Sequence, residues 1–216
     1  MDNTESGYFR IQMRVKRISM RLAKIFFKTE VMGREHAELL SGPLIIISNH
    51  TSFIDHFLIG VALPFNLKLF PIRTMAKKEQ MDRPLIGPCI KTLGGFVSKT
   101  KGKNLDELFL VPEEILKNGG VVLMYPEAFI FTDGKLHSTK SGAAELAIRT
   151  SATILPIGIS GMGHFHMPDL AKQIFARRKI KITFGRPFSA EGYSDRKILK
   201  KRIEDEMHAV FEPDYK

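Results

Sequence analysis

The sequence predicts an α/β domain in which a mostly parallel or mixed sheet is flanked by helices. Short apolar runs of strand length alternate with longer segments of helical periodicity, which is the pattern of a layered α/β fold. Hydrophobic residues make up 44% of the 216 residues, enough for a packed core. No apolar stretch approaches the ~18 residues of a spanning helix, and a single cysteine excludes an internal disulfide.

Residues 1–33 are expected to form an amphipathic helix, and residues 34–216 a single domain. Within this segment, residues 9–28 hold seven basic residues and no acid, which accounts for most of the net charge of +10. The apolar residues Ile11, Val15, Ile18, Leu22, Ile25 and Phe26 repeat at helical spacing. Beside them lies a basic row at the same spacing: Arg10, Arg14, Arg17, Arg21, Lys24 and Lys28.

A basic row beside an apolar row is typical of a helix that lies on an anionic membrane surface. We expect Phe9, Met13, Met20 and Phe27 to widen the apolar side of this helix, and Phe26 and Phe27 to contact the membrane. The alternative is a helix packed on its own domain with solvated charges. Nucleic acid is a poor fit to these rows, because no aromatic-rich basic strand or helix-turn-helix pattern accompanies them.

The elements of the domain follow in order. Strands are expected at 43–48, 67–75, 95–98, 121–125, 152–159 and 179–184. Helices are expected at 54–63, 84–93, 104–117 and 139–150. A last helix, capped by Ser194-Asp195, should direct four side chains inward: Leu199, Ile203, Met207 and Val210.

The sharpest chemical signal is the stretch from Asn49 to Asp55. A buried strand delivers His50 at its end, a polar turn follows, and Asp55 opens a helix. The carboxylate can then fold back onto one imidazole nitrogen and leave the other free as a general base. A histidine and an aspartate at this spacing are also compatible with a purely structural cap.

Two further signals follow strands. Tyr125-Pro126-Glu127 comes directly after a buried strand, where a carboxylate can accept hydrogen bonds from a polyol or remain an exposed loop residue. Gly94-Gly95 is followed by Lys99, Lys101 and Lys103, which is compatible with an anion clamp or with a solvated basic turn.

Taken together and in this order, the motifs resemble the PlsC-like glycerolipid acyltransferases, typified by 1-acyl-sn-glycerol-3-phosphate acyltransferase. Asn49, His50 and Asp55 match the family's NHx4D block, and Tyr125-Pro126-Glu127 the start of its F-P-E-G-T-R-S block. Weaker matches lie at four places: Gly95 to Lys99, Asp133 to Lys135, Lys140 to Ala143 and Leu155 to Ile157. Residues 128–131 depart from the family pattern and lack its arginine, and Lys99 stands where the family has another arginine.

The resemblance implies a glycerol-3-phosphate acyltransferase-like fold and transfer of a fatty acyl group from acyl-CoA or acyl-carrier protein to a lysophospholipid hydroxyl. His50 and Asp55 would be catalytic. Substrate would be bound by Glu127, Gly95, Lys99, Lys101, Lys103, Lys140 and Arg73. No metal or bound cofactor is expected, and the His164 and His166 pair lacks a clear further ligand.

We expect such an enzyme to be peripheral on the cytoplasmic face of a membrane, since the N-terminus lacks a signal-peptide pattern. Three alternatives remain at this level. The acceptor could be another lysolipid or alcohol, the protein could bind lipid without catalysis, or it could be a lipid hydrolase.

Overall fold

A computed structural model describes residues 3–98, 105–163, 177–213 and 215. Its centre is a mixed eight-stranded sheet in the order β1-β7-β6-β2-β5-β3-β4, with β8 paired to β6. The strands are β1 (Phe27–Met32), β2 (Leu44–Ser48), β3 (Ile72–Lys77), β4 (Phe96–Ser98), β5 (Val121–Met124), β6 (Thr153–Ser160), β7 (Arg178–Phe184) and β8 (Phe188–Ser189). The central strands β6, β2, β5 and β3 are parallel to one another, whereas β7 and β8 run antiparallel to β6.

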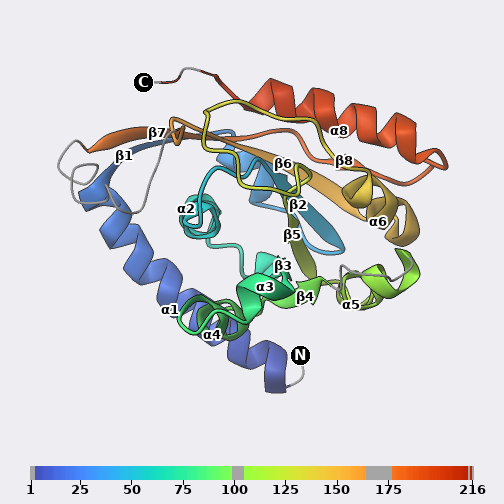
Figure 1. Ribbon diagram of the computed structural model, residues 1–216, viewed down its shortest axis with the longest axis horizontal. Helices are drawn as coiled ribbons and strands as arrows, with labels where there is room; N and C mark the ends of the chain where they lie inside the picture. Colours follow the sequence, from blue (N-terminus) through green and yellow to red (C-terminus); the bar gives the residue numbers. More distant parts are fainter. Residues whose placement is uncertain (1–2, 99–104, 164–176, 214, 216) are drawn as a thin grey trace.

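Helices cover both faces of this sheet (Figure 1). On one face, α5 (Leu105–Lys117), α6 (Gly142–Thr150) and α8 (Arg196–Val210) pack over a core that includes Ile45, Ile47 and Val122. On the other face, α2 (Asp55–Ala62) and α1 (Asn3–Phe26) cover a core that includes Ile46, Leu123 and Ile159. The short α3 (Lys78–Met81) and α4 (Ile86–Thr92) lie near β4, with the 3-10 turns η1 (Arg34–Ala37) and η2 (Leu67–Leu69) before β2 and β3.

The alternation of side chains along β2 explains the two cores. All five residues of β2 are buried. Ile46 joins the core under α2, while its neighbours Ile45 and Ile47 join the core under α5, α6 and α8. Successive side chains of a strand point to opposite faces, so a continuous apolar run is what a strand covered on both faces requires.

The N-terminal segment differs from expectation in its length and in part of its packing. The helix ends at Phe26, and residues 27–32 form the strand β1, parallel to β7, so residue 33 does not mark the end of a helical segment. Phe27 is buried and Phe26 packs against the core, which corrects our expectation that both face a membrane. The physical reason is that Phe27 begins a strand whose inward side chains must fill the core under α1.

The outward face of α1 keeps the basic row and the second half of the apolar row, while Ile11 and Val15 are half-buried. Ile18, Leu22 and Ile25 are 57%, 43% and 59% exposed. The exposed cations of this helix include Arg10, Arg14, Arg17, Arg21 and Lys24. No helix in the described ranges has both the length and the apolar character needed to cross a bilayer.

Candidate active site

Two of the motifs singled out by the sequence, those of His50 and Tyr125, meet at one edge of the sheet. Strands β2, β5 and β3 run parallel, so their carboxyl ends lie side by side. His50 follows β2, Tyr125 follows β5, and Lys77 is the last residue of β3. Ligand sites of open α/β sheets are found at this edge, because the loops that leave the strands there can converge.

His50 and Asp55 are in contact. The Nδ1 atom of His50 lies 2.9 Å from Oδ2 of Asp55, and the side chains are 15% and 0% exposed. A buried carboxylate can only accept, so Nδ1 carries the proton and donates it to Asp55. In the neutral imidazole this tautomer leaves the lone pair of Nε2 free to act as a base.

The loop between β2 and α2 surrounds the Asp55 carboxylate with donors. Besides His50, the backbone N–H groups of Thr51 and Ser52 donate to Oδ2 at 2.7 and 2.9 Å. The hydroxyls of the same two residues donate to Oδ1 at 3.2 and 2.9 Å. Five donors hold this carboxylate in one orientation, from which it can stabilise a protonated His50. The Ser52 hydroxyl donates to Asp55 and is therefore not aligned as a nucleophile.

Two backbone clamps fix the loop that carries His50. The side-chain amide of Asn49 donates to the carbonyl of Ile159 at 2.9 Å and accepts from its N–H at 2.7 Å, which joins the loop to β6. The N–H of Phe131 donates to the carbonyl of His50 at 2.9 Å. These bonds give the first residue of the NHx4D block a structural role.

Aromatic rings enclose His50 in an arrangement that the sequence analysis did not predict. Tyr125 stacks on the imidazole with ring centroids 3.9 Å apart and an angle of 13° between the planes. His56, the residue after Asp55, lies edge-on to both rings at 5.9 Å from His50 and 5.1 Å from Tyr125. Burial and the nearby His50 lower the pKa of His56 to about 4, and burial raises the pKa of Tyr125 well above its usual value. Both rings are therefore neutral at pH 7.

The buried carboxylate of Glu127 connects the loop that carries His50 to the segment that carries His137. The carboxylate accepts the N–H of His50 at 3.0 Å on one oxygen and the N–H of His137 at 2.8 Å on the other. Its side chain is 2% exposed, and burial raises its pKa against the opposing effect of these two N–H donors. The geometry makes Glu127 a brace between the His50 loop and the segment that follows β5.

The other predicted substrate ligands divide into three groups. Lys99, Lys101 and Lys103 lie outside the described residues. Arg73 contacts α1, because its guanidinium pairs with Glu5 and lies over the ring of Tyr8. Its Nε also donates to the carbonyl of Gly94 at 2.6 Å. Lys140 is exposed. Gly95 sits so close to Ile90 that a Cβ there would lie 2.8 Å from the Ile90 carbonyl, which explains the need for glycine.

Lys77 is a cation at the site that the sequence reading missed. It lies beside Ser98 across the β3–β4 pairing, and its Nζ is 3.9 Å from the ring centroid of Phe129. Phe129 is half exposed and in turn contacts Phe131, whose N–H binds His50. The extended segment expected at 67–75 stops two residues before Lys77, whereas β3 runs on to Lys77.

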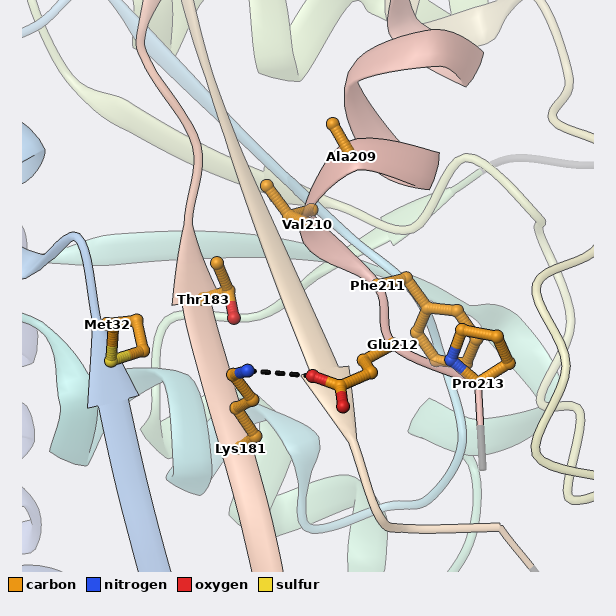
Figure 2. Close-up of a pocket in the computed structure, with 8 residues that line it drawn as sticks. All are labelled: Met32, Lys181, Thr183, Ala209, Val210, Phe211, Glu212 and Pro213. Carbon is orange, nitrogen blue, oxygen red and sulfur yellow. Dashed lines mark hydrogen bonds and ion pairs between the residues drawn. The ribbon is translucent and has the colours of Figure 1, made fainter. Parts of the chain in front are cut away.

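A separate hollow of about 340 Å³ lies beside the end of α8 (Figure 2). It is lined by the end of α8 and the outer side of β7, and an ion pair of 2.7 Å joins Lys181 to Glu212 there. Residues of the His50 site do not line it. Across the described ranges, no three His, Cys, Asp or Glu side chains come together in a way that could hold a metal ion. His164 and His166 fall outside those ranges.

Comparison with known proteins places this geometry in a family. The family model described as Acyltransferase matches residues 28–160, more than half of the chain. The chain belongs to the acyltransferase family. The matched residues include β2, β5 and β6 and therefore the whole of the His50 site.

Curated relatives of this acyltransferase carry related names. A chloroplastic 1-acyl-sn-glycerol-3-phosphate acyltransferase of Arabidopsis thaliana is 26% identical over 164 residues, covering 75% of this chain and 44% of the relative. The alpha form of 1-acyl-sn-glycerol-3-phosphate acyltransferase from Bos taurus is 24% identical over 203 residues, covering 92% of this chain and 69% of the relative. The chain thus spans less than half the length of the plant relative.

A solved structure has the same fold. The crystal structure of the 1-acyl-sn-glycerophosphate (LPA) acyltransferase PlsC from Thermotoga maritima matches with a TM-score of 0.74 at 22% identity, covering 97% of this chain and 82% of that one. The predicted fold class is confirmed: the chain has an N-terminal helix followed by a mixed sheet with helices on its two faces. The resemblance to PlsC-like acyltransferases is confirmed as well.

Proposed function

We propose that this acyltransferase moves a fatty acyl group from acyl-CoA or acyl-carrier protein to the free hydroxyl of 1-acyl-sn-glycerol-3-phosphate, which gives phosphatidic acid. The observation that carries the proposal is the 2.9 Å contact between His50 and the fully buried Asp55 at the carboxyl edge of the sheet. The names of the curated relatives supply the substrate class.

The chemistry requires one base. Nε2 of His50 takes the proton of the acceptor hydroxyl as its oxygen attacks the thioester carbonyl, and Asp55 stabilises the imidazolium that forms. Collapse of the tetrahedral intermediate breaks the carbon–sulfur bond, and the proton passes to the leaving sulfur. A thiol has a pKa of ~8.5, far below that of an alcohol, so the sulfur leaves readily.

Transfer is direct in this scheme. The Ser52 hydroxyl donates to Asp55 at 2.9 Å and accepts the N–H of Ile54 at 3.2 Å, so it has no base of its own to make it a nucleophile. The thioester already activates the acyl group, so the reaction draws on neither a metal nor a resident cofactor.

Cations at the same edge would hold the acceptor phosphate. Lys77 at the end of β3 is exposed and lies over Phe129, and Lys140 lies two residues before α6. We assign Lys77 to the phosphate in place of the family arginine that residues 128–131 lack. Glu127 then acts by holding the backbone of His50, because both of its oxygens already accept backbone N–H groups.

The acceptor and product are lipids, so the enzyme must work at a membrane surface. We infer that α1 lies on the cytoplasmic face of an anionic membrane, with Ile18, Leu22 and Ile25 in the headgroup layer. Each Lys or Arg near such a surface contributes about 1 kcal/mol, which is about a fivefold change in affinity. The inward face of α1 is occupied by Phe9, Met13 and other packing residues, so the helix docks without leaving the domain.

Point variants on the outward face test the membrane contact. Changing Ile18, Leu22 and Ile25 together to Gln should release the protein from vesicles that contain phosphatidylglycerol, while the melting temperature stays within about 2 °C of wild type. Arg17→Glu should weaken vesicle binding most at low salt. Unchanged sedimentation of both variants with vesicles would place the membrane contact elsewhere.

Product analysis with a labelled acyl donor tests the function. Wild-type protein with 1-acyl-sn-glycerol-3-phosphate in detergent should convert the label to phosphatidic acid. Release of labelled free fatty acid without diacyl product would indicate a hydrolase, and no thiol release would indicate a lipid-binding protein. A panel of other lysolipids in the same assay identifies the preferred acceptor.

A further inference from the structure

One cation of α1 is buried. The side chain of Lys16 is 3% exposed, whereas Arg14 and Arg17 on the same helix are exposed. Its ammonium donates to the carbonyls of Gly60 and Leu63 at 2.5 and 2.7 Å and lies 3.4 Å from that of Val61. A buried Lys is uncommon unless it is paired, so these contacts give the residue a purpose other than membrane attraction.

The three carbonyls lie at the carboxyl end of α2. Last-turn carbonyls of a helix lack partners within the helix. The carbonyl of Gly60 would normally accept from the N–H four residues later, but that residue is Pro64, which has none. A cation at this end also interacts favourably with the helix dipole. Lys16 thus provides the donors that the sequence of α2 itself cannot supply.

The surroundings hold the ammonium in one position. Its Nζ lies 4.9 Å from the ring centroid of Phe65 and 5.6 Å from that of Phe70. Arg34 on η1 is the charged group that faces it, and it also donates to the carbonyl of Leu63, at 3.1 Å. Burial and repulsion from Arg34 lower the pKa of Lys16 to about 8, so it is mostly charged at pH 7.

The α1 helix is itself fixed to the sheet one turn before Lys16. The side chain of Gln12 accepts from the N–H of Ile72 at 2.8 Å and donates to its carbonyl at 2.7 Å. It also donates to the carbonyl of Leu93 at 2.8 Å. The ammonium of Lys16 therefore reaches α2 from a support that is anchored to β3.

The helix held in this way is the one that carries the catalytic aspartate. Asp55 is the first residue of α2, and the carbonyls that Lys16 binds are at its other end, within nine residues. We propose that Lys16 is a positioning residue for acyl transfer: by tying the end of α2 to α1, it sets the position of Asp55 against His50. This inference rests on the proposed function, because it acts through the same base.

The size of the expected effect follows from geometry. A misplacement of about 1 Å in a catalytic group can lower a rate by ~10²-fold. Lys16→Met keeps the length and apolar stem of the side chain but removes the donors. It should lower kcat by about 10- to 100-fold on detergent-dispersed acceptor, with each KM changed less than threefold. Lys16→Arg should recover part of the loss, and Lys197→Met on α8 is the matched control with wild-type kcat.

A double-mutant cycle separates positioning from simple stabilisation. If Lys16 acts through Asp55, then Lys16→Met should change the residual kcat of Asp55→Asn less than threefold. The same loss in both backgrounds, or a folded Lys16→Met protein with wild-type kcat, would overturn the proposal. If Lys16→Met does not fold, Lys16→Gln replaces it in the same double-mutant cycle with Asp55→Asn. Wild-type protein assayed alongside shows whether the transfer reaction itself occurs, so failure of the proposed function is recognised separately.

Discussion

The ring of Tyr125 lies nearly parallel to the imidazole of His50, with centroids 3.9 Å apart and an angle of 13° between the planes. The two residues follow β5 and β2, which pair in the sheet, so the stack joins two strand ends directly above the core. It restrains the ring that must present Nε2 to substrate while Asp55 restrains Nδ1. The orientation of the base is thus set by a hydrogen bond on one side and an aromatic face on the other.

Substitutions at Tyr125 should show separately how the aromatic ring and the hydroxyl contribute to kcat and to stability. The hydroxyl is buried without a hydrogen-bond partner in the described part of the chain, so Tyr125→Phe removes an unsatisfied group. We expect kcat within twofold of wild type and stability unchanged or higher by about 1 kcal/mol. Tyr125→Leu loses a stack worth about 1 kcal/mol and should lower kcat several-fold. Equal kcat in both variants, measured at saturating substrates, would mean that the stack does not orient His50.

Asp55→Asn should impair catalysis because His50 loses the carboxylate that orients its ring and stabilises its imidazolium form. The amide no longer supports the imidazolium, and its NH2 group faces donors that need an acceptor. We expect kcat to fall by about 10²–10⁴-fold. The matched control is Asp133→Asn, which alters an exposed carboxylate paired with His137 and should leave kcat within twofold. A similar loss in both variants would argue against a special role for Asp55.

Glu127→Gln distinguishes a brace from a substrate ligand. Glutamine has one acceptor oxygen where two backbone N–H groups need acceptors, so one of them loses its bond at a cost of about 1–3 kcal/mol. We expect lower stability and lower kcat with little change in the acceptor KM. A rise in acceptor KM at constant kcat would instead show that Glu127 binds the acceptor. Initial rates with each substrate varied separately provide both values.

His56 predicts how stability depends on pH. Its pKa is lowered from 6.5 to about 4 in the folded protein, so between these values the unfolded chain binds the proton that the folded chain excludes. Its contribution is present above pH 6.5 and is lost as the pH falls toward 4. The loss amounts to at most about 3 kcal/mol. Urea unfolding at pH 7 and pH 5 should show a smaller difference for His56→Phe than for wild type, and an equal difference would contradict the assignment.

Most of the fold could be predicted because its strands and helices have distinct periods. The apolar run of β2 and the inward side chains of α8, Leu199, Ile203, Met207 and Val210, lie where the patterns place them. The strand β1 was missed because it directly continues an amphipathic helix, and Phe26 and Phe27 fit either helix or strand. Local periodicity does not show where a long helix gives way to a sheet edge.

The catalytic pair and the presence of Glu127 near it were predictable, but the contacts that surround the pair were not. His50 and Asp55 are close in sequence, so the turn alone brings them together. Tyr125, Glu127 and Lys77 reach the site through strand order, which the sequence does not reveal locally. Lys16 shows the same limit, because in the sequence it is only one of seven basic residues in 9–28, and its contact with the end of α2 appears only in the structure.

The central claim is that His50 is the base for acyl transfer, and the turnover of His50→Ala tests it most directly. Purified His50→Ala and the control His208→Ala, which changes an exposed histidine on α8, should be compared with wild type on the same labelled thioester and lysolipid. We expect His50→Ala to form the diacyl product about 10²–10⁴-fold more slowly, while His208→Ala retains the wild-type rate. A folded His50→Ala protein that turns over at a near wild-type rate would contradict the account.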